Sequence, residues 1–90
     1  MKKRIITVVG KDSVGITAKV CVYLATNQIN ILDISQTIVA GYFNMMMVVD
    51  TQESSKSTEL IASELGQIGE EIGVQIKVQH EKIFETMHRI

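Results

Sequence analysis

The feature that most constrains the fold is a hydrophobic pattern that switches between the period of a strand and the period of a helix. Residues 4–9 are a run of mainly β-branched side chains that stops at Gly10. Such a run predicts a largely buried strand at the centre of a sheet. From residue 14 to about residue 27, apolar side chains recur at helical spacing, with Asp12 or Ser13 available as the N-cap. The chain therefore begins with a strand followed by a helix.

The next two apolar runs predict a hairpin. Residues 29–39 and 42–50 flank Ala40-Gly41, a pair suited to a tight turn. The second of these strands is apolar on both faces. One face carries Phe43, Met45, Met47 and Val49, and the other carries Tyr42, Asn44, Met46 and Val48. A helix layer covers only one face, so the other needs a partner chain or the tail, whose apolar residues are Ile83, Phe84 and Met87.

A second amphipathic helix follows the polar connection at residues 51–57. Its apolar stripe repeats every three or four residues and consists of Ile61, Leu65, Ile68 and Ile72. Gly66 and Gly69 weaken this helix, which indicates close packing against a neighbouring backbone or an early helix end. Gly73 is expected to close it. Residues 74–79 then alternate strictly between apolar and polar, so the last strand should have one buried face and one face exposed to solvent.

The predicted order is β-α-β followed by β-α-β, and right-handed crossovers place both helices on one face of the sheet. We therefore predict an α+β fold, a ferredoxin-like βαββαβ sandwich with a four-stranded antiparallel sheet, two helices on one face and a short C-terminal helix. The chain is expected to form a single domain over residues 1–90, with its core over about 4–80 and a tail or short helix over 81–90.

Composition and charge exclude several classes of protein. With 46% hydrophobic and 21% charged residues, the chain has the composition of one soluble domain. Its net charge of −1 argues against direct binding of nucleic acid. The apolar runs are too short for a signal peptide or a membrane span, and the single Cys21 forms no internal disulfide. We expect a cytoplasmic protein whose thin core favours a homo-oligomer.

The segment from Gly10 to Thr17 joins the first strand to the first helix through a loop that holds two glycines. It is not a P-loop, because Ile16 follows the second glycine where a lysine would be required, so the lysine charge is missing. Two interpretations stay open. The free amides at the start of the helix could hold a small carboxylate, or the segment could be an ordinary capped turn.

Two stretches of this sequence resemble a known family. The first reads Val8-Val9-Gly10-Lys11-Asp12-x-x-Gly15-Ile16, and the second reads Asn27-x-Ile29-Asn30-Ile31-Leu32-Asp33-Ile34-Ser35-Gln36. Together they resemble the ACT domain, in particular the small stand-alone bacterial ACT-domain proteins related to the glycine cleavage system repressor. The resemblance covers about residues 4–80. It implies that two copies pair, and that an amino acid binds between the first loop and helix of one copy and the second strand of the other.

The resemblance also implies which residues form the binding site. On the loop side they are Lys11, Asp12, Ser13, Val14, Gly15, Ile16 and Thr17, and on the strand side they are Asn30, Ile31, Leu32 and Asp33. A zwitterionic ligand needs donors for its carboxylate, which the helix-start amides supply, and acceptors for its ammonium group, which Asp12, Asp33 or the Asn30 carbonyl supply. Asn30 and Asp33 have an alternative interpretation as turn-ending and solvated strand residues.

The leading hypothesis is a non-enzymatic regulatory module, a homodimer that binds a small amino acid at the subunit interface. The alternative is a pure protein–protein interaction module that docks onto an enzyme or transcription factor without a small ligand. We expect no enzymatic activity and no cofactor, because the sequence carries no catalytic constellation. Cys21 and the run Met45–Met47 are interpreted as packing residues. Glu81, Glu85 and His88 would share one face of a terminal helix, yet we expect no metal there.

Overall fold

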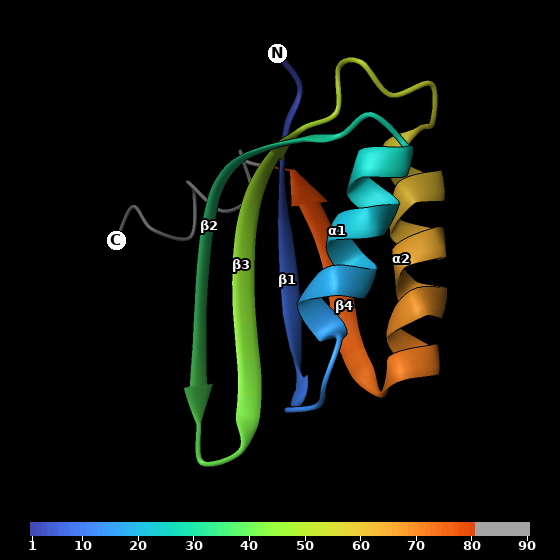
Figure 1. The fold of residues 1–90 in the computed structure, drawn as a ribbon. Coiled ribbons are helices and arrows are strands. Elements are labelled where there is room, and N and C mark those ends of the chain that lie inside the picture. The colour runs from blue at the N-terminus through green and yellow to red at the C-terminus, as the bar shows by residue number, and fades with distance from the viewer. Residues whose placement is uncertain (81–90) are drawn as a thin grey trace.

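The structure is a computed structural model and describes residues 1–80 of the chain. Its elements are β1 (Lys3–Lys11), α1 (Ile16–Thr26), β2 (Asn30–Val39), β3 (Tyr42–Asp50), α2 (Thr58–Ile72) and β4 (Val74–His80). The four strands form one antiparallel sheet in the order β2-β3-β1-β4. Both helices lie on the same face of this sheet (Figure 1). The ferredoxin-like sandwich predicted from the sequence is therefore confirmed, while the expected C-terminal helix lies outside the described residues.

The core lies between the sheet and the two helices. Ile6 and Val8 of the central strand β1 are fully buried there. The helices contribute Ile16, Val20, Leu24, Ile61 and Leu65 from above the sheet. On β3 the side chains divide as predicted: Phe43, Met45, Met47 and Val49 are buried toward the helices, whereas Tyr42 and Met46 are exposed on the other face. We call this other face, on which no described helix lies, the open face of the sheet.

The start of α1 differs from the prediction. The helix begins at Ile16 rather than at Val14, and its N-cap is Gly15, with φ of +90° and no side-chain cap hydrogen bond. Asp12 and Ser13, expected as caps, do not cap the helix. The left-handed conformation of Gly15 turns the chain just before the helix and leaves the Val14 side chain fully exposed. The first turn of α1 therefore keeps its amide donors uncapped by any side chain.

The first strand is longer than predicted, because β1 continues through Gly10 to Lys11. Gly10 pairs with Phe43 on one side and with Val74 on the other. A Cβ atom at Gly10 would lie 2.7 Å from Cγ1 of Val74, so the glycine permits a close approach between β1 and β4. It therefore serves packing within the sheet and does not end the strand.

The hairpin between β2 and β3 forms as predicted, and one of its strands carries an irregularity. Ala40 and Gly41 both have positive φ, of 51° and 80°, as a two-residue hairpin turn with the twist of the strands requires. The register of β2 against β3 shifts between Ile31 and Asp33. This bulge, which no sequence pattern indicated, re-aims the side chains that follow it.

A polar cluster links the two helices on their outer side. The Tyr23 hydroxyl donates to Oε1 of Glu64 at 2.7 Å, and Nζ of Lys56 donates to the same oxygen at 2.6 Å. The hydrogen bond from Lys56, together with that from Tyr23, holds the pKa of the Glu64 carboxyl below its usual value of 4.5. Burial and the neighbouring Glu64 carboxylate raise the pKa of Tyr23. The cluster therefore ties α1, α2 and the preceding loop together while Glu64 is ionised.

The two glycines inside α2, Gly66 and Gly69, differ in the space around their Cα atoms. The helix runs through both Gly66 and Gly69 and ends at Gly73, which has φ of 79° and forms the predicted C-cap. A Cβ atom at Gly69 would lie 2.6 Å from the carbonyl oxygen of Val74, whereas one at Gly66 would meet no atom within 4 Å. The close packing expected from these glycines is found at Gly69 alone.

The contrast between these glycines predicts opposite effects on stability. Gly66→Ala should raise the free energy of unfolding by about 0.5–1 kcal/mol, because alanine favours the helix and restricts the unfolded chain. Gly69→Ala should lower it, because the added methyl group meets the Val74 carbonyl. Urea unfolding of both variants measures the difference. Two changes of the same sign would contradict the packing of α2 against β4.

The cluster around Glu64 predicts a pH dependence. Because its folded pKa lies below 4.5, the ionised carboxylate stabilises the fold above that pH, and this contribution is lost as the pH falls through the folded pKa. Glu64→Gln should therefore destabilise the protein at neutral pH, and the deficit should shrink at about pH 3. Urea unfolding at both values tests this. Glu70→Gln, at an exposed position of the same helix, is the control, and an equal pH trend in both variants would refute the prediction.

Candidate functional site

The loop between β1 and α1 lies at the same end of the sheet as the β2–β3 turn (Figure 1). The Asp12 amide donates to the Gly41 carbonyl at 2.9 Å, which ties the loop to that turn. The first helical bond of α1 runs from the Lys19 amide to the Gly15 carbonyl at 3.0 Å. The loop is therefore held in place at its base, while its tip around Val14 projects into solvent.

Three backbone donors remain open at the start of α1. Within residues 1–80, the amides of Ile16, Thr17 and Ala18 donate to no protein acceptor, as is usual for the first turn of a helix without a cap. These donors and the positive end of the helix dipole favour a negatively charged group. A Cβ atom at Gly15 would meet no atom within 4 Å, so no part of the described chain covers this position.

The structure adds a residue that the sequence analysis missed. The Thr17 hydroxyl lies 3.5 Å from Oε1 of Gln36, its acceptor on β2. The two residues are 19 positions apart, and only the crossover from α1 to β2 brings them together. No local signal in the sequence marks Gln36 as a neighbour of the loop. The side of the site next to α1 is thus formed by the middle of β2 within the same chain.

The predicted strand-side residues lie far from the loop within one chain. Asn30 pairs with Asp50 at one end of the sheet, whereas Val39 pairs with Tyr42, which in turn pairs with Lys11 at the loop end. A ten-residue strand spans about 30 Å. The structure therefore does not bring residues 30–33 to the loop, and only a second copy could supply them there.

The outer strand β2 exposes apolar side chains along one edge of the sheet. Among the strands of residues 1–80, β2 pairs only with β3, so its other side is an open edge in this part of the chain. Ile34 and Ile38, which lie on the helix side of β2, are 44% and 60% exposed. We call the surface formed by Ile34 and Ile38 the edge surface, and exposed apolar side chains along an open strand edge indicate an interaction site.

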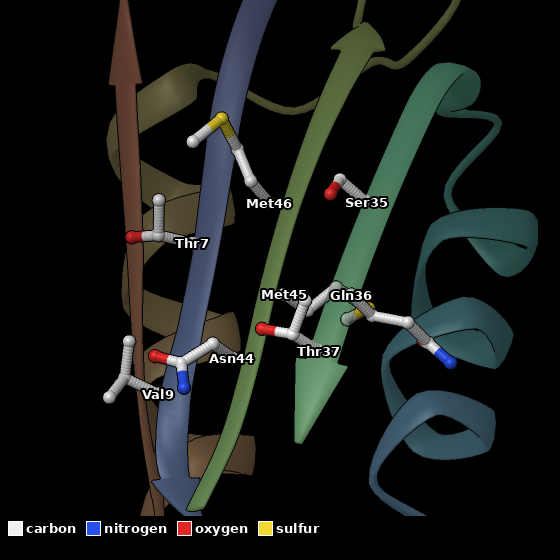
Figure 2. Close-up of a pocket in the computed structure, with 8 residues that line it drawn as sticks. All are labelled: Thr7, Val9, Ser35, Gln36, Thr37, Asn44, Met45 and Met46. Carbon is white, nitrogen blue, oxygen red and sulfur yellow. The ribbon is translucent and has the colours of Figure 1, made fainter. Parts of the chain in front are cut away.

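The open face of the sheet carries a shallow hollow of about 250 Å³. Figure 2 shows the side chains that line it, which come from β1, β2 and β3. They are Thr7, Val9, Ser35, Gln36, Thr37, Asn44, Met45 and Met46. The lining holds no charged side chain, and within residues 1–80 the hydroxyl and amide groups of Thr7, Ser35, Thr37 and Asn44 have no hydrogen-bond partner. The hollow therefore combines unpaired hydroxyl and amide groups with the exposed apolar side chains of Val9 and Met46.

Titratable groups do not assemble into a metal site in the part of the chain that the structure describes. Among residues 1–80, no three His, Cys, Asp or Glu side chains are grouped so that they could hold a metal ion. Glu81, Glu85 and His88, the triplet singled out in the sequence, lie outside this part. At the strand-side end, hydrogen bonds from the backbone of Gln52 and of Lys2 lower the pKa of Asp50.

Comparison with known proteins identifies the family. The family model described as the ACT domain matches residues 3–79. The chain belongs to the ACT domain family. It is 54% identical over 90 residues to a UPF0237 protein of Bifidobacterium longum, and the match covers 100% of both chains. The family resemblance noted in the sequence is thereby confirmed.

Two solved structures of other proteins share the fold. An ACT domain protein from Streptococcus pneumoniae superposes with a TM-score of 0.82 at 42% identity, over 93% of this chain and 94% of that one. A proposed glycine cleavage system transcriptional repressor superposes with a TM-score of 0.72 at 20% identity, over 87% of this chain and 44% of that one. At that identity the likeness shows the fold alone. No helix among residues 1–80 is long and apolar enough to cross a membrane.

Proposed function

We propose that this ACT domain protein is a non-enzymatic regulatory module, a homodimer that binds a small amino acid at its subunit interface. The observation that carries the proposal is the uncapped start of α1 at Gly15, which opens beside an unpaired and apolar sheet edge. Donors for a carboxylate and a surface for a second subunit thus lie next to each other. The regulated protein is a separate enzyme or transcription factor.

A side-by-side dimer accounts for the edge surface. Antiparallel pairing of β2 with the β2 strand of a second copy satisfies the open backbone groups of both edges and covers Ile34 and Ile38. Because the strands run in opposite directions, this pairing carries Asn30 and Asp33 of the partner subunit toward the loop end of the first. Face-to-face packing of the open faces is disfavoured, because it would bury Thr7, Ser35 and Asn44 without partners.

The chemistry of this composite site suits a zwitterion. The amides of Ile16, Thr17 and Ala18 would hold the ligand carboxylate, and Asp12 together with Asp33 of the partner subunit would accept from its ammonium group. The residues Lys11, Ser13, Val14, Ile31 and Leu32 would border the ligand. At Gly15 the absence of a side chain lets the ligand approach the backbone closely.

A second candidate function is a protein–protein interaction module without a small ligand. Val9 and Met46 favour it, because they are exposed apolar side chains on the open face and could contact a partner protein. The second candidate needs no amino acid, so direct binding measurements separate it from the first.

The dimer is tested at the edge surface. Ile34→Lys should weaken self-association by roughly tenfold or more, because it places a charge in the centre of the proposed interface. Val9→Lys places the same charge on the open face and should leave the association unchanged. Sedimentation equilibrium measures both variants beside the original chain. A chain that stays monomeric at high micromolar concentration would rule out the dimer.

The ligand is tested by isothermal titration calorimetry with glycine, serine, threonine, and the branched-chain and aromatic amino acids. Gly15→Ala should lower the affinity for the amino acid that binds by roughly tenfold, since alanine is strained at a φ of +90° and its methyl group enters the site. Gly66→Ala, a matched change on α2, should leave the affinity unaltered. Absence of heat with every amino acid would leave only the interaction module.

A further inference from the structure

The edge strand β2 contains a segment whose sequence reads almost the same in both directions. Between the bulge and the hairpin turn, the regular part of the strand is Asp33–Val39, and its middle residue is Gln36. The five central residues read Ile34-Ser35-Gln36-Thr37-Ile38. A two-fold axis through the middle residue would therefore place isoleucine opposite isoleucine and one hydroxyl side chain opposite another.

The backbone of this segment directs its free hydrogen-bonding groups to the open edge at every second residue. Val39 and Tyr42 flank the two-residue turn, and in such a hairpin the flanking residues exchange backbone hydrogen bonds. Because an antiparallel ladder alternates along the strand, the amides and carbonyls of Ile34, Gln36 and Ile38 then point away from β3. Bonds to a second strand would therefore form at these three residues, whose side chains all lie on the helix side.

No charge protects this segment against pairing with another strand. Residues 34–39 include no charged residue and no proline, which are the usual means of keeping an edge strand unpaired. The opposite edge strand, β4, carries Lys77 in its middle, and α2 packs beside it. Among the strands of residues 1–80, the distribution of charge thus favours β2 as the edge that pairs.

We propose that the β2 strands of two copies pair antiparallel about a two-fold axis at Gln36, so that Ile34 lies opposite Ile38 of the partner subunit. This inference rests on the proposed dimer and specifies its register. Only this register pairs the whole of Asp33–Val39 with itself. A shift of one residue would set opposite faces of the two strands against each other, and a shift of two would bring the bulge or the turn into the ladder.

The register also brings the two halves of the amino-acid site together. It places Asp33 of the partner subunit opposite Val39, which pairs with Tyr42 beside the turn. The same turn is bonded to the β1–α1 loop, because the Asp12 amide donates to the Gly41 carbonyl at 2.9 Å. The carboxylate that a single chain holds far from the loop thus comes to the loop end of the other subunit.

Gln36 is suited to a position on the axis. Its side chain points from β2 toward α1 (Figure 2), where its Oε1 lies 3.5 Å from the Thr17 hydroxyl. Residues that form a hydrogen-bonded pair have Cα atoms about 5.5 Å apart, so the two glutamine side chains lie next to each other across the axis. Each amide group can then accept from Thr17 of its own chain and donate to the glutamine of the partner subunit.

The register is tested by disulfide formation between single cysteines in the full chain, with Cys21→Ala as background. Gln36→Cys should form a disulfide-linked dimer roughly tenfold or more faster than Ile34→Cys, because only thiols on the axis are within reach of each other. The two Ile34→Cys thiols would be separated by four residues along the ladder, which is about 14 Å. Non-reducing electrophoresis after incubation in a glutathione redox buffer measures both rates.

Mixed chains provide a second measurement that leaves Gln36 unchanged. Ile34→Cys and Ile38→Cys should each remain largely unlinked alone and should link to each other when the two chains are mixed. Ile34→Cys mixed with Ser35→Cys is the matched control and should not link, because these residues lie three positions apart and on opposite faces.

Sedimentation equilibrium of each variant separates the register from the dimer itself. If the Cys21→Ala chain is monomeric at high micromolar concentration, the proposed dimer fails and the register fails with it. Dimers in which Ile34→Cys links to itself as fast as Gln36→Cys, or in which the mixed pair of Ile34→Cys and Ile38→Cys does not link, would overturn the register alone and leave the proposed dimer in place.

Discussion

The fold depends on the burial of one face of β1 beneath both helices. β1 lies between β3 and β4, and its side chains Ile6 and Val8 are fully buried against the helix layer. Because each helix connects two strands that flank or include β1, the crossovers must return on the same side for these side chains to be covered. The positions of the loop at Gly15 and of the edge strand β2 follow from this arrangement.

A layer of two helices over four strands leaves the edge strand β2 largely uncovered. α2 packs against β4, the opposite edge of the sheet, and α1 contacts β2 only slightly, so Ile34 and Ile38 remain exposed although they point to the helix side. Among residues 1–80, no further element covers that edge. This exposed apolar surface is the one that the proposed dimer would bury.

Much of the fold could be predicted from the sequence, because strands and helices have different hydrophobic periods. The division of β3 into a buried face with Met45 and Met47 and an exposed face with Met46 follows from alternation alone. Local conformation was harder to predict. Asp12 and Ser13 are good capping residues, yet Gly15 caps α1, because the chain turns through a left-handed conformation that no side chain can supply as easily.

Contacts between distant residues escaped prediction for a different reason. The bulge between Ile31 and Asp33 and the contact of Thr17 with Gln36 arise from the register of β2 against β3 and from the path of α1. Neither the strand register nor the path of the helix can be predicted from a local sequence pattern. The candidate site therefore could be predicted on its loop side, where a glycine precedes a helix. Residues 30–33, on its strand side, were predicted from the family resemblance alone, and within a single chain they do not lie near the loop.

The separation of the two halves of the site has a thermodynamic consequence for the proposed dimer. A ligand that contacts the loop of one subunit and residues 30–33 of the other binds the dimer better than the monomer. By linkage, that ligand must then strengthen the association of the subunits by the same factor. In the proposed dimer, the amino acid would change the equilibrium of subunit association. A separate protein that recognises the paired subunits would thus sense the amino acid without any change of fold within a subunit.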